Sequence, residues 1–332
     1  METVSIVVPT YRRTNPLRAA LDSFFFLKFP RRRLEVIVVD DGGGDREVER
    51  VVRERQGSDV SLTLISQANA GAAAARNRGA RVAQGDLLLF CDDDVLVEPD
   101  HLDQHLGTQR QYEGSLVNGV SRFAPGALSR LQATSFGRYR IELEHRFEAE
   151  ADGRRMDETC VETSFVSARN LGLGRALFWE LGGFDESFPY AGAEDQELSL
   201  RARRAGCLLL RNHGIRVLNN EPTITLRDFC LREERSAETA VVLARKLPEH
   251  AVRAIVAENG PVSRADAPAL IVKKAAKSML SVRPVLTWLK RIAERSQRAP
   301  VGEAVRRRLY QLVVGLHIFK GVRNGFRSAG SA

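Results

Sequence analysis

The sequence has few cysteines and no long apolar run. Its four cysteines are widely spaced, with no Cys-x-x-Cys pair, which argues against a zinc knuckle or a disulfide framework and suits a reducing compartment. They are Cys91, Cys160, Cys207 and Cys230. The stretch from Leu309 to Phe319 is interrupted by polar residues and is too short to span a bilayer. No basic segment or cleavage site precedes the strand-like run at Val4, so we expect a cytoplasmic protein without a secretion signal.

Positive charge is concentrated in the last quarter of the chain. The whole sequence holds 50 Lys and Arg against 42 Asp and Glu, a formal net charge of +8. Residues 251–332 hold sixteen Lys and Arg against four Asp and Glu, or +12, so residues 1–250 carry −4. A basic tail can meet nucleic acid, anionic lipid or an acidic partner, and charge alone does not choose among them.

The basic tail also contains an amphipathic pattern after Arg306-Arg307-Arg308. The apolar residues at helical spacing are Leu309, Leu312, Val313, Leu316 and Phe319. This pattern predicts a helix that lies on anionic lipid or packs against the domain that precedes the tail. Lipid contact would make the protein peripheral on the inner face of the membrane. Nucleic-acid sites interleave many aromatic side chains with cations, and the tail has only four, so nucleic acid is the less favoured partner.

The first ninety residues alternate between strand and helix patterns. Short β-branched or apolar runs at 4–8, 34–39, 62–65 and 87–91 predict strands. Helices are predicted between them, near residues 17–24, 48–52 and 72–83. Regular strand–helix alternation predicts an α/β fold with a mostly parallel sheet flanked by helices.

The signal is weaker after Pro99. Residues 100–160 look mostly helical and loop-like, and Thr163–Ala168 reads as a strand. A short helix is predicted at Arg175–Leu181 and a clearer one from Glu194 to Ala205. Beyond Pro222 the chain is basic and helical, broken by prolines.

An apolar run that ends in three acids, Asp92, Asp93 and Asp94, is the sharpest chemical signal. The run before them reads as a buried parallel strand, so the acids are expected at its C-terminal edge, where open α/β sheets bind ligands. On an extended chain Asp92 and Asp94 share a side and can both face one divalent ion. A solvated acidic turn is the alternative when this cluster is taken alone.

Three further clusters are weaker when taken singly. Asp40 and Asp41 end another strand before a glycine-rich turn, which suits either a nucleotide contact or a plain turn. Arg76 lies on an alanine-rich helix and is either a surface residue or a fixed cation for a phosphate or base. Glu194 and Asp195 begin a helix, where acids favour the helix dipole. A carboxylate held there is expected to stay ionised, as a general base for an alcohol needs.

In this order the clusters resemble the inverting family 2 glycosyltransferases, which have a GT-A, Rossmann-like fold. The resemblance covers roughly residues 3–225 and also uses Val8-Pro9-Thr10-Tyr11, Asn69-x-Gly71 and Gly182-Gly183-Phe184-Asp185-Glu186. It implies a catalytic domain over residues 1–225 and a basic helical region over 226–332. It also implies a metal-dependent, hexosyltransferase-type enzyme that inverts the anomeric carbon.

The resemblance assigns roles residue by residue. Asp92 and Asp94 match the acids that bind Mg²⁺ or Mn²⁺, and Asp195 matches the catalytic base, supported by Glu194. Asn170 falls where such enzymes shape the donor-sugar and acceptor cleft. The residues implied to line the nucleotide-sugar site are Pro9, Thr10, Tyr11, Arg12, Asp40, Asp41, Arg76 and Asp93, with Arg76 beside Asp40 and Asp41. The implied partners are a nucleoside-diphosphate sugar, UDP before GDP or dTDP, and the hydroxyl of a saccharide, a lipid-linked acceptor or a small natural product.

The chain departs from the family at one metal ligand. Many relatives carry a histidine on the strand after the Glu-Asp helix, where this sequence has Asn219 and Asn220. An asparagine offers only a neutral amide oxygen, so the third ligand is left open. His213 is the nearest histidine, and a lone loop histidine is more often solvated than a ligand.

Three other functions compete with this interpretation. A nucleotidyltransferase that makes activated sugars shares the sheet and acids, but generally opens with a glycine-rich loop that is absent after Val8. A sugar-nucleotide-binding protein without catalysis is a second alternative, and Asn219 leaves room for it. Binding of nucleic acid or an anionic surface through the basic tail is the third.

Overall fold

The computed structural model describes residues 3–57, 59–150, 152–188, 190–221, 225–247 and 252–328. The chain forms two compact units. The first, called the sheet unit, comprises residues 1–128, 144–187 and 194–222. The second, called the helical unit, comprises residues 129–143, 188–193 and 223–332. The main break lies near the division predicted at residue 225, and the helical unit takes two earlier segments as well.

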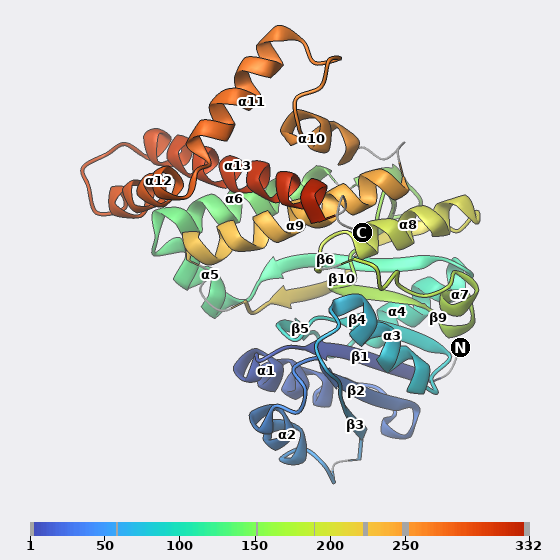
Figure 1. Ribbon diagram of the computed structural model, residues 1–332. Helices are drawn as coiled ribbons and strands as arrows, with labels where there is room; N and C mark the ends of the chain where they lie inside the picture. The colour runs from blue at the N-terminus through green and yellow to red at the C-terminus, as the bar shows by residue number, and fades with distance from the viewer. Residues whose placement is uncertain are drawn as a thin grey trace. The chain divides into compact units, whose positions relative to one another are not determined.

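The sheet unit is built on one mixed sheet with the strand order β3-β2-β1-β4-β9-β6-β10-β8-β7 (Figure 1). Its parallel part consists of β3 Ser61–Ser66, β2 Leu34–Asp40, β1 Val4–Thr10 and β4 Leu87–Cys91. Beyond β4, β9 Asn170–Gly174 runs antiparallel to β4 and to β6 Leu116–Phe123, and β10 Leu209–Asn219 is parallel to β6. The short strands β8 Cys160–Thr163, β7 Asp152–Arg155 and β5 Val95–Val97 pair antiparallel to their neighbours. The predicted α/β class is confirmed.

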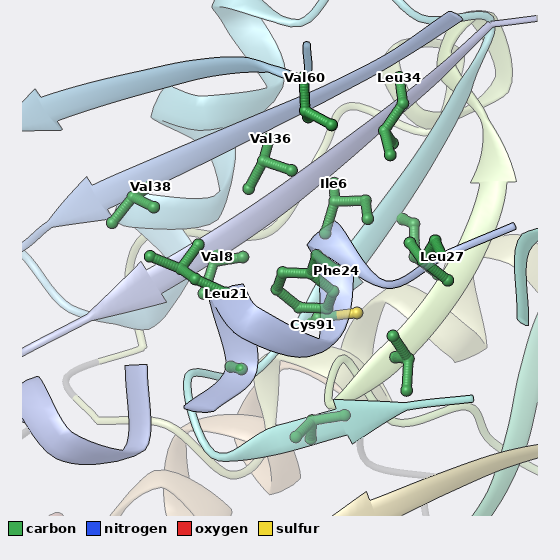
Figure 2. Close-up of a cluster of buried hydrophobic side chains, with 14 of the residues drawn as sticks. Ile6, Val8, Leu21, Phe24, Leu27, Leu34, Val36, Val38, Val60 and Cys91 are labelled. Atoms are coloured by element: carbon green, nitrogen blue, oxygen red, sulfur yellow. The ribbon is translucent and has the colours of Figure 1, made fainter. Parts of the chain in front are cut away.

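Alternate residues of the parallel strands build two cores, one on each face of the sheet. Ile6, Val36 and Leu89 pack with α1 Thr14–Phe25 and α2 Arg46–Arg53, and Figure 2 shows Phe24 and Leu21 of α1 in this cluster. On the other face lie α3 Ala72–Val82, α7 Arg175–Glu180 and α8 Glu194–Arg204. A third helix on the first face, α4 His101–Gln111, adds two leucines to the first core. Strands buried on both faces explain the continuous apolar runs in the sequence.

Two sequence predictions fail between residues 100 and 170. The predicted strand Thr163–Ala168 is wrong, because β8 ends at Thr163 and a loop leads to β9 at Asn170. The helical and loop-like region also contains the eight-residue strand β6. Asn118 and Gly119 interrupt the apolar pattern of β6, and glycine weakens a strand signal.

The helical unit is an assembly of helices around α9 Leu226–Lys246 and α13 Glu303–Ser328, with α10 Val252–Asn259, α11 Pro268–Leu280 and α12 Arg283–Ser296 (Figure 1). Helix α5 Pro125–Gln132 and helix α6 Ser135–Glu150 cross the boundary between the units. An aromatic cluster of Phe136, Tyr139, Phe229 and Tyr310 joins α6, α9 and α13.

The predicted amphipathic face of α13 is covered within its own unit. Val313, Leu316 and Phe319 are buried, and α13 packs along α9. Leu312 is exposed. This face is therefore not available to lipid. No helix in the described ranges is long and apolar enough to cross a membrane.

Candidate functional site

The three consecutive acids lie in a turn, not on an extended strand. Strand β4 ends at Cys91, and the amide of Val95 donates to the carbonyl of Asp92 at 3.2 Å, which closes a turn before β5. The expectation that Asp92 and Asp94 share one side of an extended chain is therefore wrong. The turn instead divides the three carboxylates between two cations.

Arg13 binds two of the acids. Its guanidinium lies 2.8 Å from Asp93 and 2.6 Å from Asp94, and the Thr10 hydroxyl donates to Asp93 at 2.7 Å. Burial alone would lower the pKa of Arg13, but the charges of Asp93 and Asp94 raise it by more. The net pKa is raised, so the guanidinium stays charged. Sequence reasoning chose the neighbouring Arg12, whose φ of 55° turns its guanidinium over the exposed Tyr11 ring, 5.2 Å from the centroid.

Arg76 joins the acidic turn to helix α8. It is buried, and its guanidinium donates to Asp92 and to Glu194, each at 2.8 Å. Phe184 lies under the guanidinium, 5.5 Å away. Burial lowers the pKa of Arg76, but the two carboxylates outweigh it and the pKa is raised. The expectation that Arg76 lies beside Asp40 and Asp41 is corrected by these contacts.

Asp40 and Asp41 hold the loops at the edge of the sheet. Asp40 accepts hydrogen bonds from the amides of Gly42, Gly44 and Asp45 at 2.8–2.9 Å. Asp41 accepts four hydrogen bonds of 2.8–3.0 Å. Their donors are Gln67, Asn69, Ala70 and Gly71. Both carboxylates are buried, so their contacts shape the loops, and a direct contact with a base or ribose stays a prediction.

Asp195 lies at the start of α8, next to Glu194. Its carboxylate accepts from the amide of Gln196 at 2.8 Å and from that of Ala168 at 3.4 Å. The next residue after Ala168 is Arg169, whose carbonyl accepts a hydrogen bond from the amide of Asp92 at 3.2 Å. Asp195 and the acidic turn therefore meet on the two sides of one short loop.

Burial raises the pKa of Asp195 to about 7, and the charge of Glu194 adds to the effect. Arg76 and two backbone amides oppose the shift without cancelling it. The helix start therefore does not keep the pKa of this acid low, because desolvation outweighs the dipole. The residue is half-buried, so its carboxylate can exchange a proton near neutral pH.

Arg169 is a further residue that sequence reasoning missed. Its guanidinium donates to Glu144 at 2.8 Å and to Ser121 at 3.0 Å. Burial lowers its pKa, but Glu144, followed by Asp92 and Asp94, raises it above the usual value. Nothing in its sequence position marks it, because a single arginine in a loop has no periodic pattern.

Among the described residues, neither the predicted cleft residue nor the two asparagines at the histidine position form a side-chain hydrogen bond with the three acids. Asn170 is buried, and its side-chain oxygen lies 3.1 Å from His105 of α4. Asn219 uses its oxygen to accept from the amide of Glu221 at 2.8 Å, while the amide of Asn220 donates to the carbonyl of Asp94 at 2.7 Å. His213 lies about six residues earlier on β10, about 20 Å along a strand, too far to share an ion with Asp94.

The donor set of the acidic turn fits a divalent cation that a substrate also holds. Asp92 and Asp94 each accept a hydrogen bond from an arginine through one carboxylate oxygen. The other oxygen of each carboxylate is a hard ligand that a divalent ion can take. No cluster of three or more His, Cys, Asp or Glu side chains placed to hold a metal is found in the described ranges. Mg²⁺ commonly binds through one or two carboxylates, substrate phosphates and water, so two acids are sufficient.

Comparison with known proteins agrees with this geometry. Residues 5–182 match the family described as glycosyl transferase family 2. Validoxylamine A glucosyltransferase of Streptomyces hygroscopicus subsp. jinggangensis is 29% identical over 225 residues, which cover 61% of this chain and 52% of that protein. Glycosyltransferase GlyA of Streptococcus pneumoniae serotype 4 is 31% identical over 116 residues, covering 35% of this chain and 16% of GlyA. The chain thus spans about half or less of the length of these relatives.

Two solved structures share the fold. One is mannosyltransferase PcManGT from Pyrobaculum calidifontis in complex with GDP-Man and Mn²⁺, with a TM-score of 0.58, 19% identity, and coverage of 96% of this chain and 86% of that one. The other is GalNAc-T7 with UDP, GalNAc and Mn²⁺, with a TM-score of 0.52, 15% identity, and coverage of 76% and 53%. At these identities the likeness concerns the fold.

Proposed function

Because this chain belongs to glycosyl transferase family 2, we propose that it transfers a sugar from a nucleoside-diphosphate sugar to an acceptor hydroxyl, with a divalent ion and with inversion at the anomeric carbon. The observation that carries the proposal is the double hydrogen bond of Arg76 to Asp92 and Glu194. It connects the acids proposed for the leaving group to the helix that carries the proposed base. A single displacement needs these two functions on separate groups held in one network.

On the donor side, Asp92 and Asp94 are proposed to hold Mg²⁺ or Mn²⁺. The bound ion supplies a Lewis acid for the charge of the leaving diphosphate. Arg13 fixes the carboxylate of Asp94, and Arg76 fixes that of Asp92. One solved structure contains GDP-Man with Mn²⁺ and the other contains UDP with Mn²⁺, which supports a donor with a nucleoside diphosphate bound through a divalent ion. Both UDP and GDP are therefore candidates for the donor nucleotide.

The first strand-to-helix loop is proposed to line the nucleotide site. Thr10 reaches Asp93 there, and the exposed ring of Tyr11 and the guanidinium of Arg12 lie beyond it. Asp40 and Asp41 contribute by fixing the neighbouring turns. These assignments, with Pro9 and Asn170, rest on the family resemblance and on position.

Asp195 is proposed to accept the proton of the acceptor hydroxyl. Its carboxylate is oriented by the amides of Ala168 and Gln196. Arg76 holds Glu194, whose charge helps to raise the pKa of Asp195 to about 7. A carboxylate with this pKa is a stronger base than an ordinary one and is still substantially ionised at neutral pH. The acceptor is a saccharide, a lipid-linked hydroxyl or a small natural product.

A binding and turnover experiment tests this function. UDP, GDP and dTDP are each added with and without Mn²⁺, and the rise of the unfolding midpoint reports binding. Turnover is the release of nucleoside diphosphate from the matching sugar nucleotides. Asp195→Asn is expected to lower turnover about 10²–10⁴-fold and to keep donor binding, because it removes only the base. Asp94→Ala is expected to reduce the Mn²⁺-dependent midpoint rise.

Asp103→Asn is the matched control, since Asp103 is an exposed acid in the first turn of α4. Full turnover in Asp195→Asn removes the assignment of the base. A nucleotide-induced midpoint rise that is equal with and without Mn²⁺, and unchanged in Asp94→Ala, removes the metal from the proposal. Release of pyrophosphate would indicate a nucleotidyltransferase instead.

A further inference from the structure

Helix α11 presents an apolar face to solvent. One side of this helix is entirely apolar and exposed along its length: Ile271, Val272, Ala275, Ala276, Met279 and Leu280. Val272 is 68% exposed and Met279 74%. The helix projects away from α9 and α13, as Figure 1 shows. A continuous exposed apolar surface on a folded chain indicates an interaction site.

The charged side of α11 faces inward. Lys274 is the one buried residue of this fully described helix, and its ammonium donates to Asp266 at 2.7 Å. Lys277 donates to Asn259 at 2.6 Å, and Lys273 lies 3.3 Å from Glu258. The helix is therefore held to its own unit by its lysines, which leaves the apolar side outward.

The chain that follows α11 combines exposed apolar residues with cations. Trp288 of α12 is 61% exposed. A cavity of about 540 Å³ between α9, α12 and α13 has a basic lining with two acids, Glu234 and Glu294. Four of its cations form no ion pair with any residue that the structure describes: Arg227, Arg283, Lys290 and Arg291. The helical unit, which carries the apolar face, thus also has cations that no described acid neutralises.

We propose that α11 docks the helical unit on an anionic lipid surface. An exposed apolar helix side, in a unit that also carries an exposed tryptophan and unpaired cations, suits an anionic lipid surface, which takes up apolar side chains and offers phosphates to cations. A second copy of the chain fits less well, because residues 251–332 carry +12 and two such surfaces repel. The docking helix is α11, because the amphipathic face of α13, for which the sequence predicts lipid contact as one of two alternatives, is buried along α9.

Vesicle sedimentation of the whole chain tests the proposal. Vesicles of phosphatidylcholine are compared with vesicles that also contain phosphatidylglycerol. The chain is expected to bind the anionic vesicles, and the double variant Val272→Glu, Met279→Glu is expected to bind at least tenfold less. Both residues are exposed, so the variant is expected to keep the unfolding midpoint. Val305→Glu is the control, because Val305 is an apolar residue of α13 that is 51% exposed.

Two further measurements separate the insertion of apolar side chains into the lipid from the electrostatic attraction of the cations to it. Arg283→Gln with Arg291→Gln is expected to weaken binding about fivefold for each cation and to flatten its dependence on salt. Trp288 fluorescence, recorded in Trp179→Phe, is expected to shift to shorter wavelength with anionic vesicles. The proposal is overturned if the chain ignores anionic vesicles at low salt or if the double variant binds like the control. A dimer in solution that the double variant dissociates would assign the face to a second copy and also overturn it.

Discussion

The sheet unit pairs the arginines of its site with acids, whereas the helical unit leaves several cavity cations without an ion pair among the described residues. In the sheet unit Arg13 and Arg76 meet carboxylates at 2.6–2.8 Å, and the acids of the site are held by these cations. In the helical unit Arg283 and Arg291 line a cavity without an ion pair among the described residues. Paired buried charges fix a geometry, whereas unpaired surface charges create a field that a partner can meet.

The two units also differ in whether their apolar residues are buried or exposed. Leu87, Leu88, Leu89 and Phe90 are fully buried in the sheet and carry the acidic turn on a rigid base. Helix α11 has an apolar side that the described residues of its unit leave exposed. The first arrangement suits a site that must hold atoms in place, and the second suits a surface that docks.

Removing one cation from each unit tests this contrast and has the largest expected effect on stability. Arg76→Gln is expected to lower the free energy of unfolding by about 3–5 kcal/mol, because it leaves Glu194 buried without its cation. Arg283→Gln is expected to change it by less than about 0.5 kcal/mol. Urea unfolding monitored by circular dichroism measures both.

Arg78→Gln is the control for Arg76, since Arg78 is an exposed residue of the same helix α3. It is expected to behave like Arg283→Gln. Equal losses at Arg76 and Arg78 would contradict the view that paired charges hold the site together.

Lowering the pH is expected to change the stability contributed by one acid of each unit in opposite directions. Burial raises the folded pKa of Asp195 to about 7, so its ionisation costs stability progressively as the pH rises from about 4 to 7. Burial also raises the pKa of Glu234, but hydrogen bonds from His317 and Lys320 outweigh it and the net pKa is lowered. The stability from Glu234 is therefore present above about pH 4.5 and is lost as the pH falls through its folded pKa.

The measurement is the free energy of unfolding of two variants between pH 4 and 8. The free energy of unfolding of Asp195→Asn is expected to exceed that of the unmodified chain by on the order of 2–4 kcal/mol at pH 8 and to differ little from it near pH 4. Glu234→Gln is expected to lose about 1–3 kcal/mol at pH 7 and less in acid. If Asp195→Asn destabilises the chain at pH 8, the raised pKa is refuted.

Much of the fold could be predicted because it follows from local patterns. The strands β1 to β4 and the helices α1, α3 and α8 have continuous runs or helical spacing that matches their burial. The acids were placed correctly at the ends of strands, because parallel strands end at one edge of a sheet. Strand β6 was missed where Asn118 and Gly119 interrupt its pattern.

The rest depends on contacts that no local pattern contains. Arg13, and not Arg12, reaches the acids because the backbone at Arg12 has a positive φ. The raised pKa of Asp195 comes from its burial against distant segments. Amphipathic spacing shows that a helix has an apolar side, but not whether that side turns inward, as in α13, or outward, as in α11.

Glycine substitutions compare the packing of the two units and have the smallest expected effects. A methyl group on Gly79 would lie 2.4 Å from Val7, and one on Gly321 would meet the carbonyl of Glu234. Ala at either position is therefore expected to cost about 1–3 kcal/mol. Gly107 of α4 and Gly315 of α13 have nothing within 4 Å, so Ala there is expected to stabilise by up to about 1 kcal/mol. Thermal unfolding of the four variants checks this, and a loss at Gly315 equal to that at Gly321 would contradict the view that the close approach to Glu234 causes the loss at Gly321.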